Sequence, residues 1–343
     1  MASTSVETRR PAPTIALDTA DTADAAVVIC AYTEDRWDDI LAAICSVDEQ
    51  SLTPVERIVV VDHNTELLTR LRRAAPHWTV IPNIGPKGLS GARNTASETA
   101  TAAWIAFLDD DASAERDWLR LLVEAVSARR ASGGGGHVEP RWERKPRWLA
   151  QEFWWVVGCS YRGLPRVIAD VRNPIGASMI VRTSLLAEIG GFSTSLGRQG
   201  RNQAGCEETE MCIRAADRTG GAFVYVPDSV VHHRVPASRA TVSYFVRRCY
   251  AEGMSKRQVT ELAGAHDGLS AERSFALRVA STGIARHLGA LGHGDGAGVV
   301  RALSIVVGMA VTSAGYAMAE ARMRVEVRTR RVRPHRPAPS LAG

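Results

Sequence analysis

Continuous apolar stretches alternate with amphipathic ones along the first two thirds of the chain. The apolar stretches are rich in β-branched residues; they are residues 26–32, 57–64, 78–83, 104–111, the first part of 173–192, and 222–235. Helical periodicity lies between them, at residues 37–49, 66–75, 88–100, 116–130, the second part of 173–192, and from about residue 207. This order predicts an α/β fold, with a mostly parallel sheet covered by helices on both faces.

Polar side chains stand where three of the predicted strands end. Tyr32 and Asp62 close two of them, and the triplet Asp109, Asp110 and Asp111 closes a third. In open α/β sheets, ligands bind beyond the carboxyl ends of the strands. These residues therefore predict a binding site along one rim of the sheet.

The acidic triplet needs an explanation, because neighbouring carboxylates raise one another's pKa unless a cation neutralises them. Asp109 and Asp111 form a DxD pattern that suits a hard divalent cation, and Mg²⁺ is commonly held by one or two carboxylates plus substrate phosphates. The alternative is an N-cap for the following helix. One Asp is enough for a cap, so the cation explains more of the pattern.

A second acidic cluster lies in the first turn of the helix predicted from residue 207. Glu207, Glu208 and Glu210 are favoured there by the helix dipole, and Glu210 is spaced to pair with Arg214. That structural explanation stays open. A carboxylate at a helix start behind a long polar loop is also well placed to act as a general base.

Two histidines and a glycine-rich turn add candidate ligands. His232 and His233 end a strand, so their side chains point to opposite faces and at most one serves the site, as a further metal ligand. The turn at residues 85–94 can present backbone N–H groups to phosphate. Its Lys87 and Arg93 would be cationic partners for a diphosphate.

Four tryptophans, Trp142, Trp148, Trp154 and Trp155, lie between the two acidic clusters. Aromatic faces suit sugar rings or lipid, but core packing is the default for such side chains.

The amino-acid composition limits the classes of protein to which the chain can belong. The content of 45% hydrophobic and 23% charged residues is ordinary for a globular protein. The six cysteines form no CxxC pair, which predicts a reducing compartment and no structural zinc. Residues 1–25 lack a continuous apolar core and are predicted to be a disordered leader rather than a secretory signal.

The net charge of +5 comes from the C-terminal end. Residues 322–336 contain seven arginines and one Glu, so the rest of the chain carries −1. A nucleic-acid-binding protein would carry basic residues among aromatic ones on a folded surface, so no nucleic-acid partner is expected. A basic tail after an apolar segment fits an anionic membrane surface, and a solvated disordered tail is the alternative.

Residues 302–319 carry no charge, but their small residues favour a buried or membrane-lying helix over a spanning one.

Taken in order, the motifs resemble a family-two glycosyltransferase of the GT-A fold. They are VVICAYTEDRW, RIVVVDHN, GLSGARN, FLDDDA, GASMIVRTSLLAEIGGF, CEETEMCIRA and PDSVVHH, within residues 26–236. Their fixed order is more specific than any single motif. The resemblance implies transfer of a sugar from a nucleotide-diphosphate donor, preferably a UDP-sugar, to an acceptor hydroxyl. It also implies inversion at the anomeric carbon and a Mg²⁺ or Mn²⁺ cofactor.

The resemblance also implies roles for individual residues. Those placed at the donor are Tyr32, Glu34, Asp62, Lys87, Arg93, Asp109 and Asp110. The metal ligands are Asp111 and His233, with His232 as the alternative. The catalytic base is Glu208, with Glu207 as the alternative because the usual Glu-Asp pair reads Glu-Glu here. The acceptor region is Trp142, Trp148, Gly176 and Ala177.

The segments HVEPRW, PRWL and RRCYAEGMSK resemble a subgroup associated with cell-envelope glycan assembly. We therefore expect the acceptor to be a glycan or a lipid-linked glycan. We expect the enzyme to be cytoplasmic, or to lie at the inner face of the cell membrane with peripheral contact through its C-terminal helices and Arg-rich tail.

The predicted organisation is a leader (1–25), a GT-A domain (26–240), a helical extension (241–320) and a basic disordered tail (321–343). The alternatives are a nucleotidyltransferase, which the acidic CAYTEDRW stretch disfavours, and a non-catalytic nucleotide-sugar-binding scaffold at a membrane.

Overall fold

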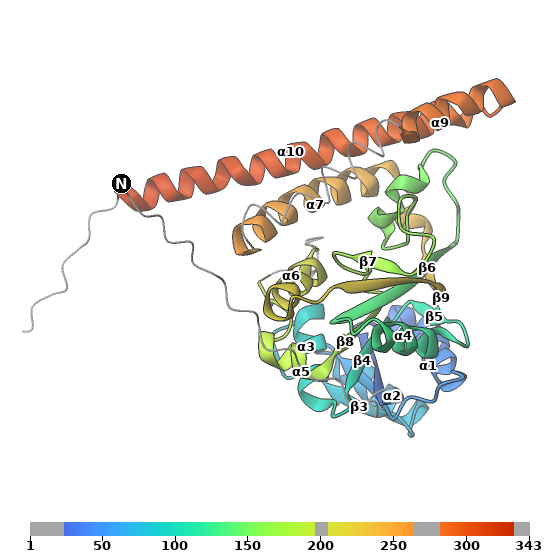
Figure 1. The fold of residues 1–343 in the computed structure, drawn as a ribbon, viewed down its shortest axis with the longest axis vertical. Helices are drawn as coiled ribbons and strands as arrows, with labels where there is room; N and C mark the ends of the chain where they lie inside the picture. Colours follow the sequence, from blue (N-terminus) through green and yellow to red (C-terminus); the bar gives the residue numbers. More distant parts are fainter. Residues whose placement is uncertain (1–23, 196–204, 264–281, 333–343) are drawn as a thin grey trace, which may run out of the picture.

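The computed structural model describes residues 24–195, 205–263 and 282–332 (Figure 1). Nearly all of the predicted leader therefore lies outside the described residues, as do 333–343 and most of the polar loop before Glu207.

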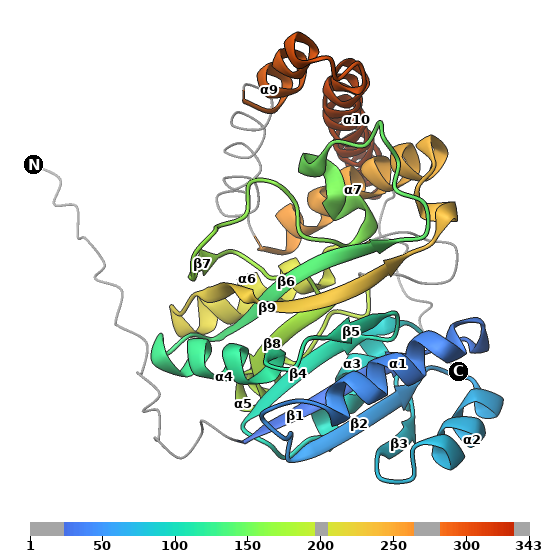
Figure 2. The same ribbon diagram turned by 90° about the vertical axis from the view of Figure 1, so that its right-hand side faces the viewer.

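A mixed sheet forms the centre of the described fold (Figures 1 and 2). Its nine strands among the described residues are β1 (Ala25–Ala31), β2 (Glu56–Val61), β3 (Thr79–Pro82), β4 (Trp104–Asp109), β5 (Ala112–Ala114), β6 (Gly133–Trp142), β7 (Ala169–Val171), β8 (Ser178–Arg182) and β9 (Phe223–Val235). The order is β3-β2-β1-β4-β8-β6-β9-β5, with β7 pairing β9. Strands β3, β2, β1 and β4 are parallel, as predicted. β8 runs antiparallel to both β4 and β6, and β6 is parallel to β9.

Helices cover both faces of this sheet. On one face lie α1 (Trp37–Asp48), α2 (Thr65–Ala74) and α4 (Trp118–Ala128); on the other lie α3 (Leu89–Thr99), α5 (Thr183–Ile189) and α6 (Glu207–Thr219). Alternate residues of each strand serve the two cores. In β1, Val27 and Ile29 pack in the first core, and Ala26 and Val28 pack in the second. This explains why the strands are apolar at nearly every position.

The glycine run Gly133–Gly136 forms the buried start of β6. The sequence pattern predicts no strand here, because glycine is depleted in strands. A Cβ atom at Gly135 would overlap the backbone oxygen of Ser178, and one at Gly136 would overlap that of Ser229. Glycine therefore allows the neighbouring backbones to approach closely.

The C-terminal part of the chain is helical, as predicted. It contains α7 (Val242–Ala263), α9 (Ile284–Gly289), the 3-10 helix η6 (Ala290–His293) and α10 (Ala297–Val332). We expected helical structure to end near residue 320, but α10 continues to Val332, so residues 321–332 are helical. The other proposed domain boundaries stay predictions.

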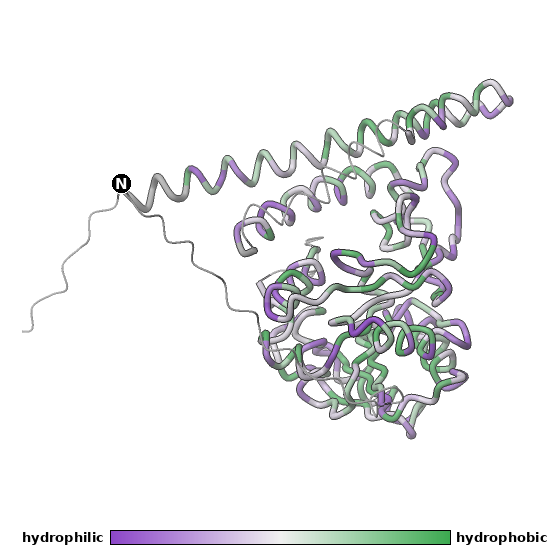
Figure 3. Tube along the Cα trace, in the orientation of Figure 1, coloured by the Kyte–Doolittle hydropathy of each residue, from purple (hydrophilic) through white to green (hydrophobic). Residues whose placement is uncertain are grey.

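Of the described helices, α10 alone is long and apolar enough to cross a membrane by length and composition. Its most apolar window has a mean hydropathy of 1.7, and only 28% of it is buried. Hydrophobic residues predominate along its middle (Figure 3).

Candidate active site

Strand register brings the acidic triplet to the rim of the sheet. Asp109 ends β4 and is paired in register with Cys30 of β1. The short strand β5, which follows the triplet, pairs antiparallel with β9 and sets Ala112 opposite His233. The backbone N–H of Arg234 donates to the backbone oxygen of Asp111 at 2.8 Å. This pairing carries Asp111 to the end of β9.

Asp109, Asp111 and His233 form a compact group that could hold a metal ion. One ligand atom from each lies within 4.8 Å of the others. Asp111 and His233 are buried, with Asp111 Oδ1 and His233 Nε2 3.1 Å apart, whereas the side chain of Asp109 is 30% exposed. Asp109 thus gives the group access to solvent.

Two arginines from distant parts of the chain neutralise the triplet. Arg36 ends the 3-10 helix η2 (Glu34–Arg36), and its Nη1 donates to Asp110 Oδ1 and lies 3.1 Å from Asp111 Oδ2. Arg239 ends the 3-10 helix η4 (Ala237–Arg239) and reaches the same Asp111 oxygen at 3.6 Å. Asp110 Oδ2 is buried and has no hydrogen-bond partner among the described residues.

The surroundings separate the pKa values of these groups. Burial, with help from Asp111 and Asp109 and against Arg36, raises the pKa of Asp110 to about 7. Burial opposes charge on Asp111, but His233, Arg36 and Arg239 outweigh it and hold the pKa of Asp111 well below its usual range. Burial also disfavours the imidazolium of His233, yet Asp111 raises the pKa of His233 to about 10. Asp111 and His233 therefore attract one another as opposite charges, and His233 would release its proton on binding a divalent cation.

A second cluster is organised by Arg93 of α3, which is 1% exposed. Its Nη1 donates to Glu208 Oε1 at 2.9 Å and lies 3.9 Å from Glu207 Oε1. Its Nη2 lies 3.7 Å from Asp109 Oδ1 and donates to the backbone oxygen of Gly176 at 3.3 Å. One guanidinium thus connects the end of β4 with the first turn of α6.

Glu207 and Glu208 differ in their access to solvent. The Glu207 side chain is 3% exposed, whereas that of Glu208 is 19% exposed. Gly176 lies directly against Glu208, because a Cβ there would overlap Glu208 Oε1. Ala177, the next residue, is buried. Of the two carboxylates, Glu208 is the one that an incoming molecule can reach.

Asp62 organises the glycine-rich turn at the next strand end. Its Oδ1 accepts from Asn83 Nδ2 at 2.6 Å, and its Oδ2 accepts from the backbone N–H of Gly88 at 2.9 Å. Asn83 also accepts from Thr95 Oγ1 of α3 at 2.9 Å. Lys87 is exposed on this turn. The turn is therefore held against the rim, although both Asp62 oxygens are already used within the protein.

Other predicted donor residues lie at the end of β1. Tyr32 is 52% exposed, and the Arg36 guanidinium lies 5.1 Å from the centre of its ring. Glu34 lies 3.6 Å from Arg70 of α2. Arg93, expected to face a diphosphate, instead lies buried among carboxylates. Tyr32 thus offers an open aromatic face, and the donor roles of these residues stay predictions.

Trp142, Trp148 and His232 lie apart from this cluster. Trp142 packs edge-on against Trp154 at 5.8 Å between ring centres, and Trp148 packs against Phe245 at 5.4 Å. His232 points to the other face of β9 and lies 3.0 Å from Glu115. The predicted opposition of the two histidines is therefore observed, and the acceptor role of the tryptophans stays a prediction.

Sequence reasoning missed Arg36, Arg239, Asn83 and Cys30 at this site. Burial raises the pKa of the Cys30 thiol to about 12, which disfavours the reactive thiolate form. Arg36 and Arg239 belong to short 3-10 helices without a recognisable pattern, and only the fold brings them to the triplet. Asn83 had a usable signal, because it closes a predicted strand, as Asp62 does.

Residues 26–190 match the profile of the family described as Glycosyl transferase family 2. A glucosyl-dolichyl phosphate glucuronosyltransferase of Haloferax volcanii is 33% identical over 236 residues, 67% of this chain and 75% of that protein. The succinoglycan biosynthesis protein ExoM of Rhizobium meliloti is 25% identical over 260 residues, 74% of this chain and 77% of that protein.

Among solved structures, the crystal structure of GalNAc-T7 with UDP, GalNAc and Mn²⁺ superposes with a TM-score of 0.47 at 15% identity. The match covers 74% of this chain and 54% of that one.

The family match covers β4, which ends at the acidic triplet, and the relatives extend the similarity over most of the chain. It favours sugar transfer over the nucleotidyltransferase alternative. The chain belongs to glycosyl transferase family 2 and is an enzyme of the GT-A type that transfers a sugar from a nucleotide donor.

Proposed function

We propose that this enzyme is a metal-dependent, inverting glycosyltransferase with Glu208 as its catalytic base. The donor is a nucleotide-diphosphate sugar, preferably a UDP-sugar, and the acceptor is a hydroxyl of a lipid-linked or cell-envelope glycan. One observation supports the proposal. The guanidinium of Arg93 contacts both Glu208 and Asp109, and Asp109 belongs to the group that could hold a metal ion together with Asp111 and His233. A metal-ligand set and a reachable carboxylate therefore lie side by side.

The residues present fit a divalent cation. Carboxylate oxygens suit Mg²⁺ and Mn²⁺, and an imidazole nitrogen is a common additional ligand. Asp110 Oδ2 is a buried acceptor without a hydrogen-bond partner in the described part of the chain, as expected where a ligand completes a site. Asp109, Asp111 and His233 would hold the ion. When bound, it would neutralise charge on the departing diphosphate.

The protein's own groups then have separate tasks. Glu208 accepts the proton from the acceptor hydroxyl as this attacks the anomeric carbon. Arg93 holds the Glu208 carboxylate in place and keeps it close to Asp109. The rigid turn between Asp62 and Gly88 shapes the donor side of the rim. Burial of the Glu207 side chain favours Glu208 over the alternative base.

The acceptor class is inferred from the relatives. One is named for a glucosyl-dolichyl phosphate acceptor, and another for succinoglycan biosynthesis. The first name specifies a sugar attached to a lipid phosphate, and the second a polysaccharide. We propose an acceptor of this kind for the present enzyme, which would act at the cytoplasmic face of the membrane.

A panel of nucleotide sugars tests the donor and the metal together. One UDP-sugar is expected to be hydrolysed with Mn²⁺ or Mg²⁺ present, and EDTA is expected to lower the rate at least tenfold, because the diphosphate charge is then not neutralised. Added Mn²⁺ should restore the rate, which separates metal loss from unfolding. Equal rates in EDTA and in Mn²⁺ would contradict the metal-dependent mechanism.

Gly176→Ala tests the placement of the base. The new Cβ would collide with Glu208 Oε1 and displace the carboxylate, so kcat is expected to fall about tenfold to a hundredfold. Gly289→Ala in α9 is the matched control, because a Cβ there meets no atom within 4 Å. An unchanged kcat for Gly176→Ala would show that Glu208 does not act from this position.

A further inference from the structure

One side of α10 is exposed and apolar along most of its length. Its large exposed side chains are Val299, Val300, Leu303, Val306, Met318 and Val325. At 100° per residue they fall within a sector of about 120°. Small apolar residues fill the gaps in this sector; they are Ala310, Ala314, Ala317 and Ala321. We call this sector the α10 face.

The opposite side of α10 is packed tightly against α7. A Cβ at Gly253 of α7 would overlap the Thr312 backbone oxygen, and one at Gly315 of α10 would overlap that of Tyr250. Farther along, Arg257 of α7 forms an ion pair with Glu320. The two helices therefore run side by side in close contact (Figures 1 and 2).

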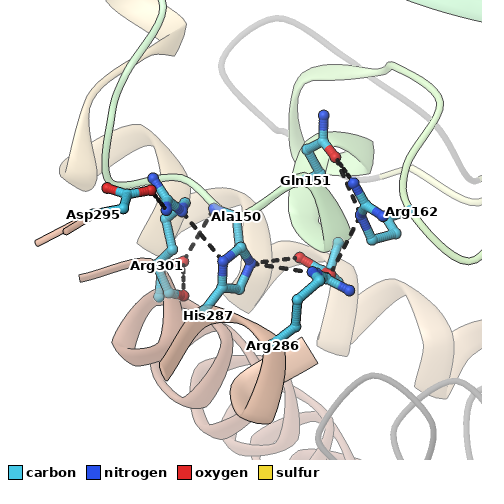
Figure 4. Close-up of polar contacts among 9 residues, drawn as sticks. Ala150, Gln151, Arg162, Arg286, His287, Asp295 and Arg301 are labelled. Atoms are coloured by element: carbon cyan, nitrogen blue, oxygen red, sulfur yellow. Dashed lines mark hydrogen bonds and ion pairs between the residues drawn. The ribbon is translucent and has the colours of Figure 1, made fainter. Parts of the chain in front are cut away.

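A buried polar network fastens the start of α10 to the catalytic domain (Figure 4). Glu152, in the 3-10 helix η3 (Gln151–Val157), is 2% exposed. Its carboxylate pairs with Arg286 and lies 3.2 Å from His287 Nε2, both in α9. The backbone N–H of Ala150 donates to Ser304 Oγ of α10 at 3.2 Å. Together with α7, these contacts hold α10 at both ends.

This packing disfavours a transmembrane path for α10 in the folded protein. α7 lies along α10 and carries many charged residues, namely Arg247, Arg248, Glu252, Lys256 and Arg257. If α10 crossed a bilayer, it would draw these charges into the hydrocarbon layer, where ionised side chains are costly. Of the surface of α10, the described part of the chain leaves the α10 face free to meet lipid.

The C-terminal end of the α10 face is basic. Arg322 and Arg324 lie there, and the Arg324 side chain is 78% exposed. A second copy docked in parallel on this face would bring these arginines together. An anionic lipid surface instead attracts them.

We propose that the α10 face docks in the plane of an anionic bilayer, with its apolar side chains among the lipids and α10 parallel to the surface. The arginines at its C-terminal end contact the lipid headgroups. Amphipathic helices with basic flanks bind membranes in this way. The inference goes beyond the proposed sugar transfer, and its tests do not depend on that activity.

Vesicle flotation of the full chain tests the partner. Binding to vesicles of phosphatidylcholine with 30% phosphatidylglycerol, roughly the charge of an anionic leaflet, is expected to exceed binding to pure phosphatidylcholine at least tenfold. The double variant Leu303→Glu with Val306→Glu should lower binding to the anionic vesicles by more than tenfold. Two apolar side chains that would lie among the lipids then become charged. The control, Val55→Glu with Val167→Glu, alters exposed valines outside α10 and should bind like the wild type.

The outcomes separate lipid from a second copy. The proposal predicts that sedimentation without lipid gives the same mass for wild type and both double variants. It would be overturned if Leu303→Glu with Val306→Glu left vesicle binding unchanged, or converted a dimer to a monomer. Circular dichroism and urea unfolding report on folding, so a misfolded variant is replaced by Arg322→Ala with Arg324→Ala. That pair should weaken binding to the anionic vesicles about fivefold per arginine.

Depth measurements test the orientation. A fluorophore is attached to cysteines introduced at Leu303, Ala310 and Met318, with the exposed Cys45 replaced by Ser. For an in-plane helix, spin-labelled lipids should quench all three positions at the same shallow depth. A spanning helix would separate the first and last positions by about 22 Å, at a rise of about 1.5 Å per residue. A graded depth would therefore overturn the proposal.

Discussion

Replacing Glu208 with Gln is expected to lower kcat by about a hundredfold to ten-thousandfold while donor binding persists. The amide keeps the shape of the side chain but cannot accept the proton of the acceptor hydroxyl. Glu208 is more exposed than its neighbour Glu207 in the first turn of α6, and Arg93 holds it beside Asp109. The measurement is steady-state transfer, together with the Kd of the nucleotide donor.

Two further variants make this result specific. Glu207→Gln changes the buried neighbour and is expected to affect stability more than proton transfer. Glu124→Gln, in an exposed ion pair of α4, should leave kcat unchanged. If Glu207→Gln abolished turnover and Glu208→Gln did not, the base would be Glu207.

Replacing Arg93 with Leu is expected to lower the free energy of unfolding by about 3 to 5 kcal/mol. Arg93 is almost fully buried and is the shared counterion of Glu207, Glu208 and Asp109. Its removal leaves three carboxylates close together without the cation that neutralises them. Urea unfolding monitored by tryptophan fluorescence measures the loss.

Arg218→Leu is the matched control for this prediction. Arg218 pairs with Glu188 at 2.9 Å, but its side chain is 50% exposed. Exposed pairs of this kind contribute about 1 kcal/mol or less, so the loss should be small. Equal destabilisation by both substitutions would show that the Arg93 cluster is not a buried electrostatic centre.

The order of strands and helices could be read from local patterns. β1, β2 and β4 are apolar at nearly every position, and Leu67 and Leu71 set the buried side of α2. Such periodicity reflects burial, which acts on each segment separately. The polar strand ends Tyr32, Asp62 and Asp109 were predictable for the same reason, since parallel strands end at one rim.

Long-range pairing was not predictable from the sequence. The glycine run reads as a break, yet it becomes β6 because the neighbouring backbones leave no space for a Cβ. β5 has only three residues and exists because β9 pairs with it. The direction of β8 relative to β4 likewise follows from tertiary packing.

By itself, the sequence determined the α/β class, the acidic rim and the candidate base, because these depend on residue type and short-range order. Only the tertiary structure decided that Arg36 and Arg239 neutralise the triplet, that His233 rather than His232 faces Asp111, and that Arg93 lies among carboxylates. It also decided that α10 lies along α7 with one apolar side uncovered. Residues that form ion pairs or pack together come from distant segments of the chain, and they make contact only in the folded protein. A local sequence pattern therefore does not predict these contacts.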